Sequence, residues 1–420
     1  MASFPAWVRA FLGDKTEHPR GPHSQGSVTR RVEPVSLREP VSLNVEHNEF
    51  ALALHKELRE IRRNLFFSPF SIRMALAMTY AGARGETASQ MKRALCFGSS
   101  DEAVQRHIAD ITHKFSARNR TGDVSMANAL WSQEGAPLCP EFVDLVARHY
   151  GGSLNTLDFG QPEAARATIN GWVEHETKGR IPELLRQGSL TDETRLVLAN
   201  AVYFKGTWEL KFKATETRDE PFYLEDGVTV SVPVMHQRKQ FRYVEEQGFQ
   251  AVNLDFQGGD VSMIVLLPDT KDGLWNLEAR VTAPMLHECL PRMFAHDVRL
   301  SLPRFKMACG IDNVVCALQA RGMVMPFDPL TADFSGINGL RAPAEDALFI
   351  STVVHKAFVE LNEDGAEAAA ATAGTVAGCA AGAPRAVTFR ADHPFLFAIR
   401  DTRSGAILFL GRVADPTAES

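Results

Sequence analysis

The residue types that usually carry catalysis do not fall into the spacings that enzymes use. No serine lies in a GxSxG turn, no histidine pair forms HExxH, and no GxxxxGK[ST] phosphate loop occurs. Two acidic pairs, Glu225–Asp226 and Glu363–Asp364, stand beside a turn-forming glycine, where a solvated loop explains them. Catalytic triads are defined in space, so missing motifs alone do not exclude an enzyme. Because no set of residues meets the requirements of a catalytic site, we predict that the chain is not an enzyme.

The most unusual segment of the chain is a long run of small residues. Between 366 and 383, sixteen residues are Ala, Gly, Thr or Val, and the two exceptions are Glu367 and Cys379. Alanine favours a helix, and the composition would also suit a linker. However, the segment joins two strand-like segments, and a loop of this length inside a domain is usually functional or disordered.

The same segment has the period of a strand that could enter a sheet. Alternate residues of a strand face the core. Here that face would hold only small, uncharged residues, which are Ala366, Ala368, Ala370, Thr372, Gly374 and Val376. Glu367 would point to solvent. Size and alternation together predict a segment that can slide between packed strands.

Composition and charge place the chain among globular proteins. Its 420 residues are 45% apolar, and a net charge of −6 gives no reason to expect nucleic acid as a partner. No apolar stretch is long enough to span a membrane, and Pro5 and Arg9 interrupt the only candidate signal peptide. The location therefore stays unknown, with the cytoplasm favoured over the extracellular space. The six cysteines form no CxxC pair, and we expect most of them to be free thiols.

Helical periodicity dominates the first half of the chain. Residues 1–40 read as a flexible tail and 41–420 as a single domain. Phe50, Leu54 and Leu58 share one helical face, and Ser68 followed by Pro69 is a typical helix start. Further helices are expected at 87–95 and at 163–178, the second of which ends at Gly179.

Strand patterns dominate the second half. Strands are expected at 195–204, 261–267, 352–361, 395–399 and 406–413. No internal repeat and no linker divides the chain between 45 and 415. These patterns predict one mixed α+β domain.

Several segments, in this order and spacing, make the chain resemble the serpin family over nearly all of its ordered length. They are Asn64–Ile72, Leu198–Trp208, Leu302–Lys306, His355–Ala357, Glu363–Ala371, His393–Phe397 and Phe409–Val413. The resemblance implies the serpin fold, with three β-sheets, eight or nine helices and an exposed reactive-centre loop, here at about 363–385. It also implies inhibition of a serine protease by suicide-substrate trapping, in which the cleaved loop inserts as a central strand of the large sheet.

The resemblance assigns roles to individual residues. The fifteenth residue counted from the hinge glycine Gly365 is Cys379, which predicts Cys379–Ala380 as the reactive bond. Arg385 is the rival site, for a trypsin-like target, whereas the small residues favour an elastase-like or subtilisin-like protease. The hinge comprises Glu363, Gly365, Ala366, Glu367, Ala368, Ala369, Ala370, Ala371 and Thr372, with Glu363 matching a hinge pair with Arg304. The shutter and breach positions are Ser68, Ser71, Asn200, Trp208 and His355.

Two alternatives remain open from the sequence. A non-inhibitory serpin would be a carrier, chaperone or storage protein, and such members usually have bulky, charged or proline residues in the hinge. A cluster of basic residues matches a polyanion site of some serpins, although a solvated helix face explains it better. That cluster consists of His107, His113, Lys114, Arg118 and Arg120. We expect a monomer whose partner is its target protease in a covalent complex, with no nucleic acid, membrane, cofactor or metal.

Overall fold

Two β-sheets and the helices around them make up the residues that the structure describes. The structure is a computed structural model, and it describes residues 39–60, 62–110, 124–150, 153–311, 314–366 and 386–418. These residues all belong to one compact unit, which starts at Arg38. The tail predicted at 1–40 lies almost entirely outside them, so its boundary stays a prediction.

The seven-stranded sheet runs in the order β3-β2-β4-β12-β13-β5, with β11 paired to β12 on the opposite side from β4. Its strands are β2 (Val124–Gln133), β3 (Ser153–Leu157), β4 (Leu196–Phe204), β5 (Gly206–Thr207), β11 (Phe305–Ile311), β12 (Thr352–Asn362) and β13 (Gly365–Ala366). The strands expected at 195–204 and 352–361 are therefore the two central strands of this sheet.

The nine-stranded sheet runs in the order β1-β16-β15-β9-β8-β7-β10-β14, with β6 paired to β7. Its strands are β1 (Leu65–Phe67), β6 (Arg218–Tyr223), β7 (Thr229–Glu246), β8 (Phe249–Asp255), β9 (Val261–Pro268), β10 (Phe294–Pro303), β14 (Val387–Arg390), β15 (Phe395–Asp401) and β16 (Ile407–Val413). The long strand β7 pairs with β6 and β10 over most of its length and with β8 at its end. Strand β7 thereby connects the strands β6 and β10 to the strand β8 by hydrogen bonds. For this reason the described residues form two hydrogen-bonded sheets where three were expected.

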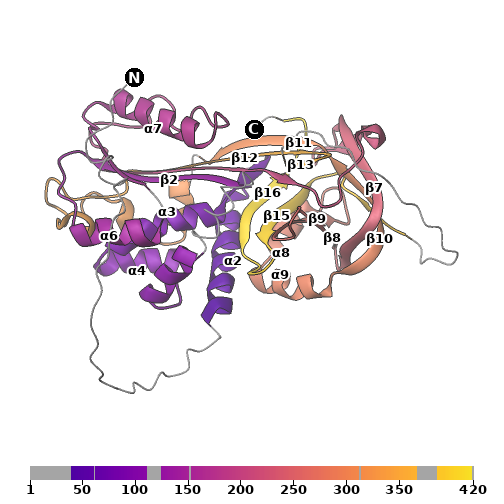
Figure 1. The fold of residues 1–420 in the computed structure, drawn as a ribbon, viewed down its shortest axis with the longest axis horizontal. Coiled ribbons are helices and arrows are strands. Elements are labelled where there is room, and N and C mark those ends of the chain that lie inside the picture. Colours follow the sequence, from indigo (N-terminus) through magenta and orange to yellow (C-terminus); the bar gives the residue numbers. More distant parts are fainter. Residues whose placement is uncertain are drawn as a thin grey trace, which may run out of the picture. The chain divides into compact units, whose positions relative to one another are not determined.

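Helices cover both faces of the seven-stranded sheet, and others lie beside the nine-stranded sheet (Figure 1). They are α2 (Glu39–Leu58), α3 (Pro69–Gly82), α4 (Gly85–Ala94), α6 (Pro140–His149), α7 (Pro162–Glu176), α8 (Leu274–Arg280), α9 (Ala283–Cys289), α10 (Val314–Ala320) and α11 (Ser335–Asn338). All nine residues of β4 are buried, because α7 and its neighbours cover one face and the main core covers the other.

The expected start of α3 is confirmed. The side-chain oxygen of Ser68 accepts a hydrogen bond from the backbone N–H of Ser71 at 3.1 Å, and Pro69 occupies the first turn. The cap fixes where the helix begins, and so it fixes the direction in which Ser68 and Ser71 face. The Ser71 hydroxyl contacts β2 and β4 on the underside of the seven-stranded sheet, and the Ser68 hydroxyl donates to the Leu408 carbonyl on β16.

Neither disulfides nor membrane-spanning helices occur in the described part of the chain. Its five cysteines, which are Cys96, Cys139, Cys289, Cys309 and Cys316, are free, as expected. Cys379 lies outside the described residues. Within the same residues, no helix has the length and apolar character needed to cross a bilayer.

Candidate loop-insertion site

The first residues of the predicted hinge already lie inside the large sheet. Gly365 and Ala366 form β13, which is antiparallel both to β12 and to β5. Ala366 pairs with Leu361 on one side and with Gly206 on the other, and it is fully buried. The sheet is therefore open at this end by the width of one strand, and the start of the hinge fills the opening.

Glycine is required at the first position of β13. Gly365 has φ +137°, and a Cβ there would lie 2.0 Å from the carbonyl oxygen of Gly206. It would also lie 2.8 Å from the Cα of Thr207 and the backbone nitrogen of Trp208. These are backbone atoms that cannot turn away, so only a residue without Cβ lets the chain pass this close to β5.

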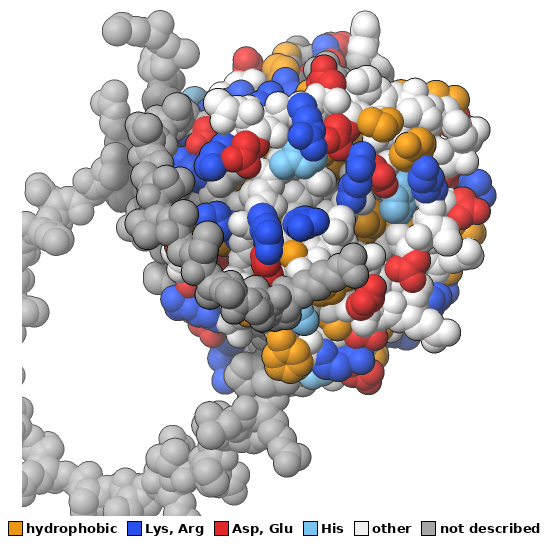
Figure 2. Space-filling view, turned by 90° about the vertical axis from the view of Figure 1, so that its right-hand side faces the viewer, with side chains coloured by type: hydrophobic (Ala, Val, Ile, Leu, Met, Phe, Trp, Pro, Cys, Tyr) orange, Lys and Arg blue, Asp and Glu red, His pale blue; other side chains and the backbone are white. Residues whose placement is uncertain are grey.

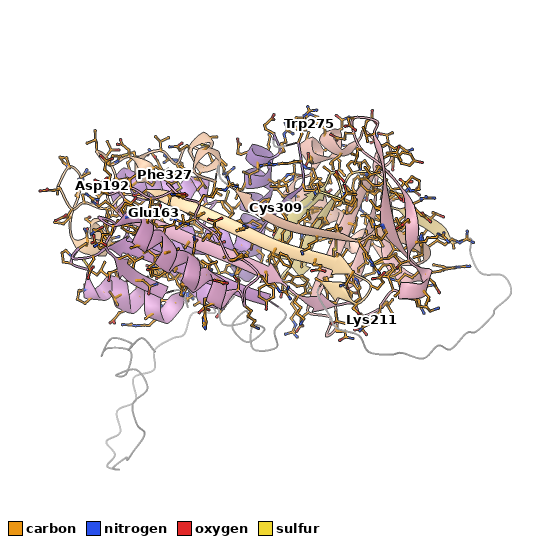
Figure 3. The ribbon with its side chains drawn as sticks, turned by 90° about the horizontal axis from the view of Figure 1, so that it is seen from above. Glu163, Asp192, Lys211, Trp275, Cys309 and Phe327 are labelled. Carbon is orange, nitrogen blue, oxygen red and sulfur yellow. The ribbon has the colours of Figure 1, made fainter. Side chains whose placement is uncertain are left out.

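Charged and aromatic side chains hold the turn that leads into β13. Arg304 donates from Nε to Glu363 at 2.8 Å, and the Thr217 hydroxyl donates to the same carboxylate. Burial opposes the charge of Glu363, but these hydrogen bonds hold its pKa below the usual value. Lys211 pairs with Asp364 at 2.8 Å, and Figure 3 shows Lys211 at the end of the sheet away from Asp192.

Trp208 lies directly beneath this turn. Its indole Nε1 donates to the carbonyl oxygen of Asn362 at 3.0 Å, and its ring stacks on Phe256 with centroids 4.4 Å apart. The ring is 1% exposed. Since the backbone N–H of Trp208 also donates to the carbonyl of Asp364, the indole and its backbone together fix both ends of the turn.

Below the opening, β4 and β12 pair directly with each other. The ladder is parallel and joins Val197–Tyr203 to Thr352–Phe358. A strand can enter the middle of this sheet only if the ladder parts.

A cluster of polar side chains lies under the middle of the ladder. His355 and Asn200 are paired in register on β12 and β4, and the Nδ1–H of His355 donates to Oδ1 of Asn200. The amide of Asn200 donates in turn to Ser71 and to Asn128 on β2. Ser68 completes the cluster, because its backbone N–H donates to Nε2 of His355 at 3.0 Å and its hydroxyl to the Leu408 carbonyl at 2.8 Å. The network therefore ties helix α3 to the two strands that would have to separate.

Comparisons with known proteins agree with this architecture. Residues 45–416 match the family described as Serpin (serine protease inhibitor). The chain belongs to the serpin family. It is 40% identical to leukocyte elastase inhibitor A of Rattus norvegicus over 89% of this chain and 99% of that protein. It is 35% identical to antithrombin-III of Mus musculus over 92% and 84% of the two chains. The solved structure of uncleaved ovalbumin has a TM-score of 0.79 and 33% identity, with 89% of this serpin and 99% of ovalbumin covered.

The serpin fold places each described candidate residue at one of two positions. Glu363, Gly365, Ala366 and Trp208 lie at the open end of the large sheet, and Ser68, Ser71, Asn200 and His355 lie under its middle. The remaining hinge residues, Glu367, Ala368, Ala369, Ala370, Ala371 and Thr372, lie outside the described residues, as do Cys379, Ala380 and Arg385. Of the suggested polyanion cluster only His107 is described, so that cluster stays a prediction.

Burial keeps His355 of this serpin neutral. Desolvation lowers its pKa from 6.5 to about 3. The accepting role of Nε2 toward the Ser68 N–H agrees with this state, because a protonated ring would have no lone pair for that hydrogen bond.

Three residues that contact the polar cluster or the hinge turn were not predicted from the sequence. Asn128 lies in register with Asn200, and each stands between two alanines, at 127–129 and 199–201. That repeated pattern could have identified Asn128. Thr217 and Lys211 carry no such signal, because their partners Glu363 and Asp364 are more than 140 positions away. Among the described residues, no group of three or more His, Cys, Asp or Glu side chains is placed to hold a metal ion.

Proposed function

We propose that this serpin inhibits a serine protease by offering residues 363–385 as bait and inserting the cleaved loop between β4 and β12. The observation that carries the proposal is the position of β13. Its two residues occupy the open end of the sheet, antiparallel to both neighbours, in a register that leads directly toward the β4–β12 ladder.

The register can be continued residue by residue. The residue numbers of each β13–β12 pair add up to 727, and those of each β13–β5 pair add up to 572. Since β5 follows β4 along the chain, the second sum can be continued onto β4. The difference of 155 equals the offset of the present β4–β12 ladder, in which His355 pairs with Asn200. Parting the ladder therefore leaves two strands already aligned for a third. Thr372 would come to lie between His355 and Asn200, and the inward-facing set would continue from Ala366.

The length of the sheet favours Cys379 as the residue before the cut. Continuing the register, Val376 is the last loop residue with a partner, because β4 begins at Leu196. A protease attached to Cys379 would then hang on three residues, or about 10 Å of chain, whereas one attached to Arg385 would hang on nine, or about 30 Å. The shorter tether holds the protease against the end of the sheet. Together with the small residues before the bond, it favours an elastase-like or subtilisin-like target.

A non-inhibitory role is the alternative, and it is less well supported. The described hinge residues Gly365 and Ala366 fit the sheet, and Ala366 fills a fully buried position. The inserted strand would add roughly ten ladder hydrogen bonds at about 1 kcal/mol each. A gain of about 10 kcal/mol is of the order of the stability of a protease domain.

A protease panel tests the proposal. Incubation with elastase-like and subtilisin-like proteases should give an SDS-resistant complex and release a peptide that begins at Ala380. A trypsin-like protease should release a peptide that begins at residue 386 without forming a stable complex. Cleavage by every protease, with no complex at all, would show that the loop is only a substrate.

A further inference from the structure

Four arginines line a hollow on the nine-stranded sheet, directly beyond the C-terminal end of the bait segment. The hollow has a volume of about 420 Å³ and lies over β6, β7, β10 and β14. Its arginines are Arg218, Arg238, Arg299 and Arg390. Figure 2 shows the end of the molecule that carries β7 and β10, where Lys and Arg side chains gather near the middle of the face. We call this pocket, with its four arginines, the arginine hollow.

Two carboxylates beside the arginine hollow, Glu220 and Asp297, are recessed beneath the guanidinium groups. Glu220 accepts from Arg218 at 2.7 Å and from Arg390 at 2.9 Å, and Asp297 pairs with Arg238. The side chains of Glu220 and Asp297 are 13% and 20% exposed, whereas Arg218 is 71% exposed. These two carboxylates are therefore less exposed than the arginines that they pair with, while Glu216, which also lines the hollow, is 45% exposed and pairs with Lys213 at 2.8 Å.

The side chain of Arg299 has no hydrogen bond or ion pair with any described residue, only a longer-range attraction to Asp297. It pairs in register with Arg238 on β7, so two like charges stand directly opposite each other on neighbouring strands. Such a pair destabilises a sheet. The other arginines are paired with three carboxylates, because Arg390 also pairs with Asp392 at 3.3 Å, and Glu216 in the lining pairs with Lys213. Among the described residues around the hollow, five basic side chains therefore face four acidic ones, and the one excess positive charge is that of Arg299.

The arginine hollow lies within reach of a protease bound to the loop. Thr388 and Arg390 line it, and both belong to β14, which begins at Val387. Val387 is eight positions after Cys379, so Cys379 lies at most about 29 Å from the start of β14. A protease domain of about 250 residues is roughly 45 Å across. Its surface beside the active-site cleft can therefore meet the hollow while its cleft holds the loop.

We propose that the arginine hollow is a docking surface for acidic side chains beside the active-site cleft of the target protease. The inference rests on the proposed inhibitory function. Exposed charges act mainly on the rate of encounter, because complementary potentials steer two surfaces together before the loop is engaged. The hollow would thus select acidic proteases among those that accept the same bait residues.

The test compares two single substitutions of equal charge change. Arg299→Glu reverses the charge of the side chain that has no partner among the described residues. Lys239→Glu is the matched control, because Lys239 is exposed, lies next to Arg238 on β7, and faces the other side of the strand. The rate of loss of intact loop is measured with an acidic and a basic protease of elastase-like or subtilisin-like specificity. Thermal melting of each variant checks that it is folded.

For the acidic protease in about 20 mM salt, Arg299→Glu should slow the reaction roughly tenfold, and the difference should fall below about twofold in 0.5 M salt. Lys239→Glu should change the rate by less than about twofold. The basic protease should not be slowed by Arg299→Glu. Equal effects of the two substitutions, or a loss that salt does not reduce, would overturn the proposal.

A sulfated polysaccharide is added to the same assay to test whether the arginine hollow binds a polyanion and not the protease. The docking proposal is also overturned if Arg299→Glu abolishes acceleration by the polysaccharide while leaving the rate without it unchanged. The assay counts every loop that is cut, whether the protease is then trapped or released. The docking proposal is therefore tested even if the protein turns out not to inhibit. Absence of any covalent complex with the unaltered protein would instead count against the inhibitory function.

Discussion

An arginine at position 368 should turn the inhibitor into a substrate. Continued from β13, the register places residue 368 between Val359 on β12 and Phe204 on β4. Those side chains are 0% and 1% exposed, so the inward face at this point is closed to water. Ala368→Arg would have to bury an unpaired guanidinium there, which costs several kcal/mol.

This free-energy cost slows loop insertion, which competes with hydrolysis of the acyl-enzyme and release of the protease. Each 1.4 kcal/mol added to the insertion barrier slows it about tenfold, so about 3–4 kcal/mol slows it several-hundredfold. Hydrolysis of the acyl-enzyme is unaffected and should win. The first inserting residues would still enter, but the strand would stop one residue beyond the pair it already forms.

Glu367→Arg is the matched control for this experiment. Residue 367 would lie between the exposed Lys205 and the half-buried Glu360, on the outer side of the sheet. The assay is the ratio of SDS-resistant complex to cleaved protein at fixed protease concentration. Ala368→Arg should give almost only cleaved protein, and Glu367→Arg should still give complex. If both variants inhibit, or if both fail, the inward and outward assignment is wrong.

Two further predictions concern the hinge glycine and the buried histidines. Gly365→Ala should expel β13, because its Cβ would lie 2.0 Å from the Gly206 carbonyl oxygen; amide hydrogen exchange should rise at Gly206 and Thr207, and unchanged exchange would contradict the packing argument. Burial lowers the pKa of His355 and of His47 to about 3, so the unfolded chain takes up protons below pH 6.5 that the folded chain does not. Stability should therefore be full above pH 6.5 and fall by about 4 kcal/mol between pH 6.5 and 5, at about 1.4 kcal/mol per unit for each histidine. Denaturant unfolding measures it, and a flat profile over that range would show that the histidines are not held neutral.

The central strands and the start of α3 could be predicted from local patterns alone. The apolar run that became β4, the alternation in β12 and the Ser68–Pro69 start all depend on neighbouring residues. The inward face of the loop could be predicted for the same reason, and buried Ala366 is its first described member.

The contacts that hold the hinge could not be predicted in this way. Thr217 and Lys211 meet their partners only because β5 is brought beside β13. The connection of the sheets through β7 could not be predicted either. The alternation of residue types in a long strand predicts the strand, but it does not predict which strands pair with it. The arginine hollow depends on the register of Arg238 with Arg299, which are 61 positions apart in the sequence. Pairing across such distances is a tertiary property.

Thermal unfolding of the loop-cleaved protein tests the central claim most directly. If the loop enters between β4 and β12, about 10 kcal/mol of added stability should raise the melting temperature by at least about 10 °C. A melting temperature within about 2 °C of that of the intact protein would mean that the cleaved loop stays outside the sheet, and it would contradict the account.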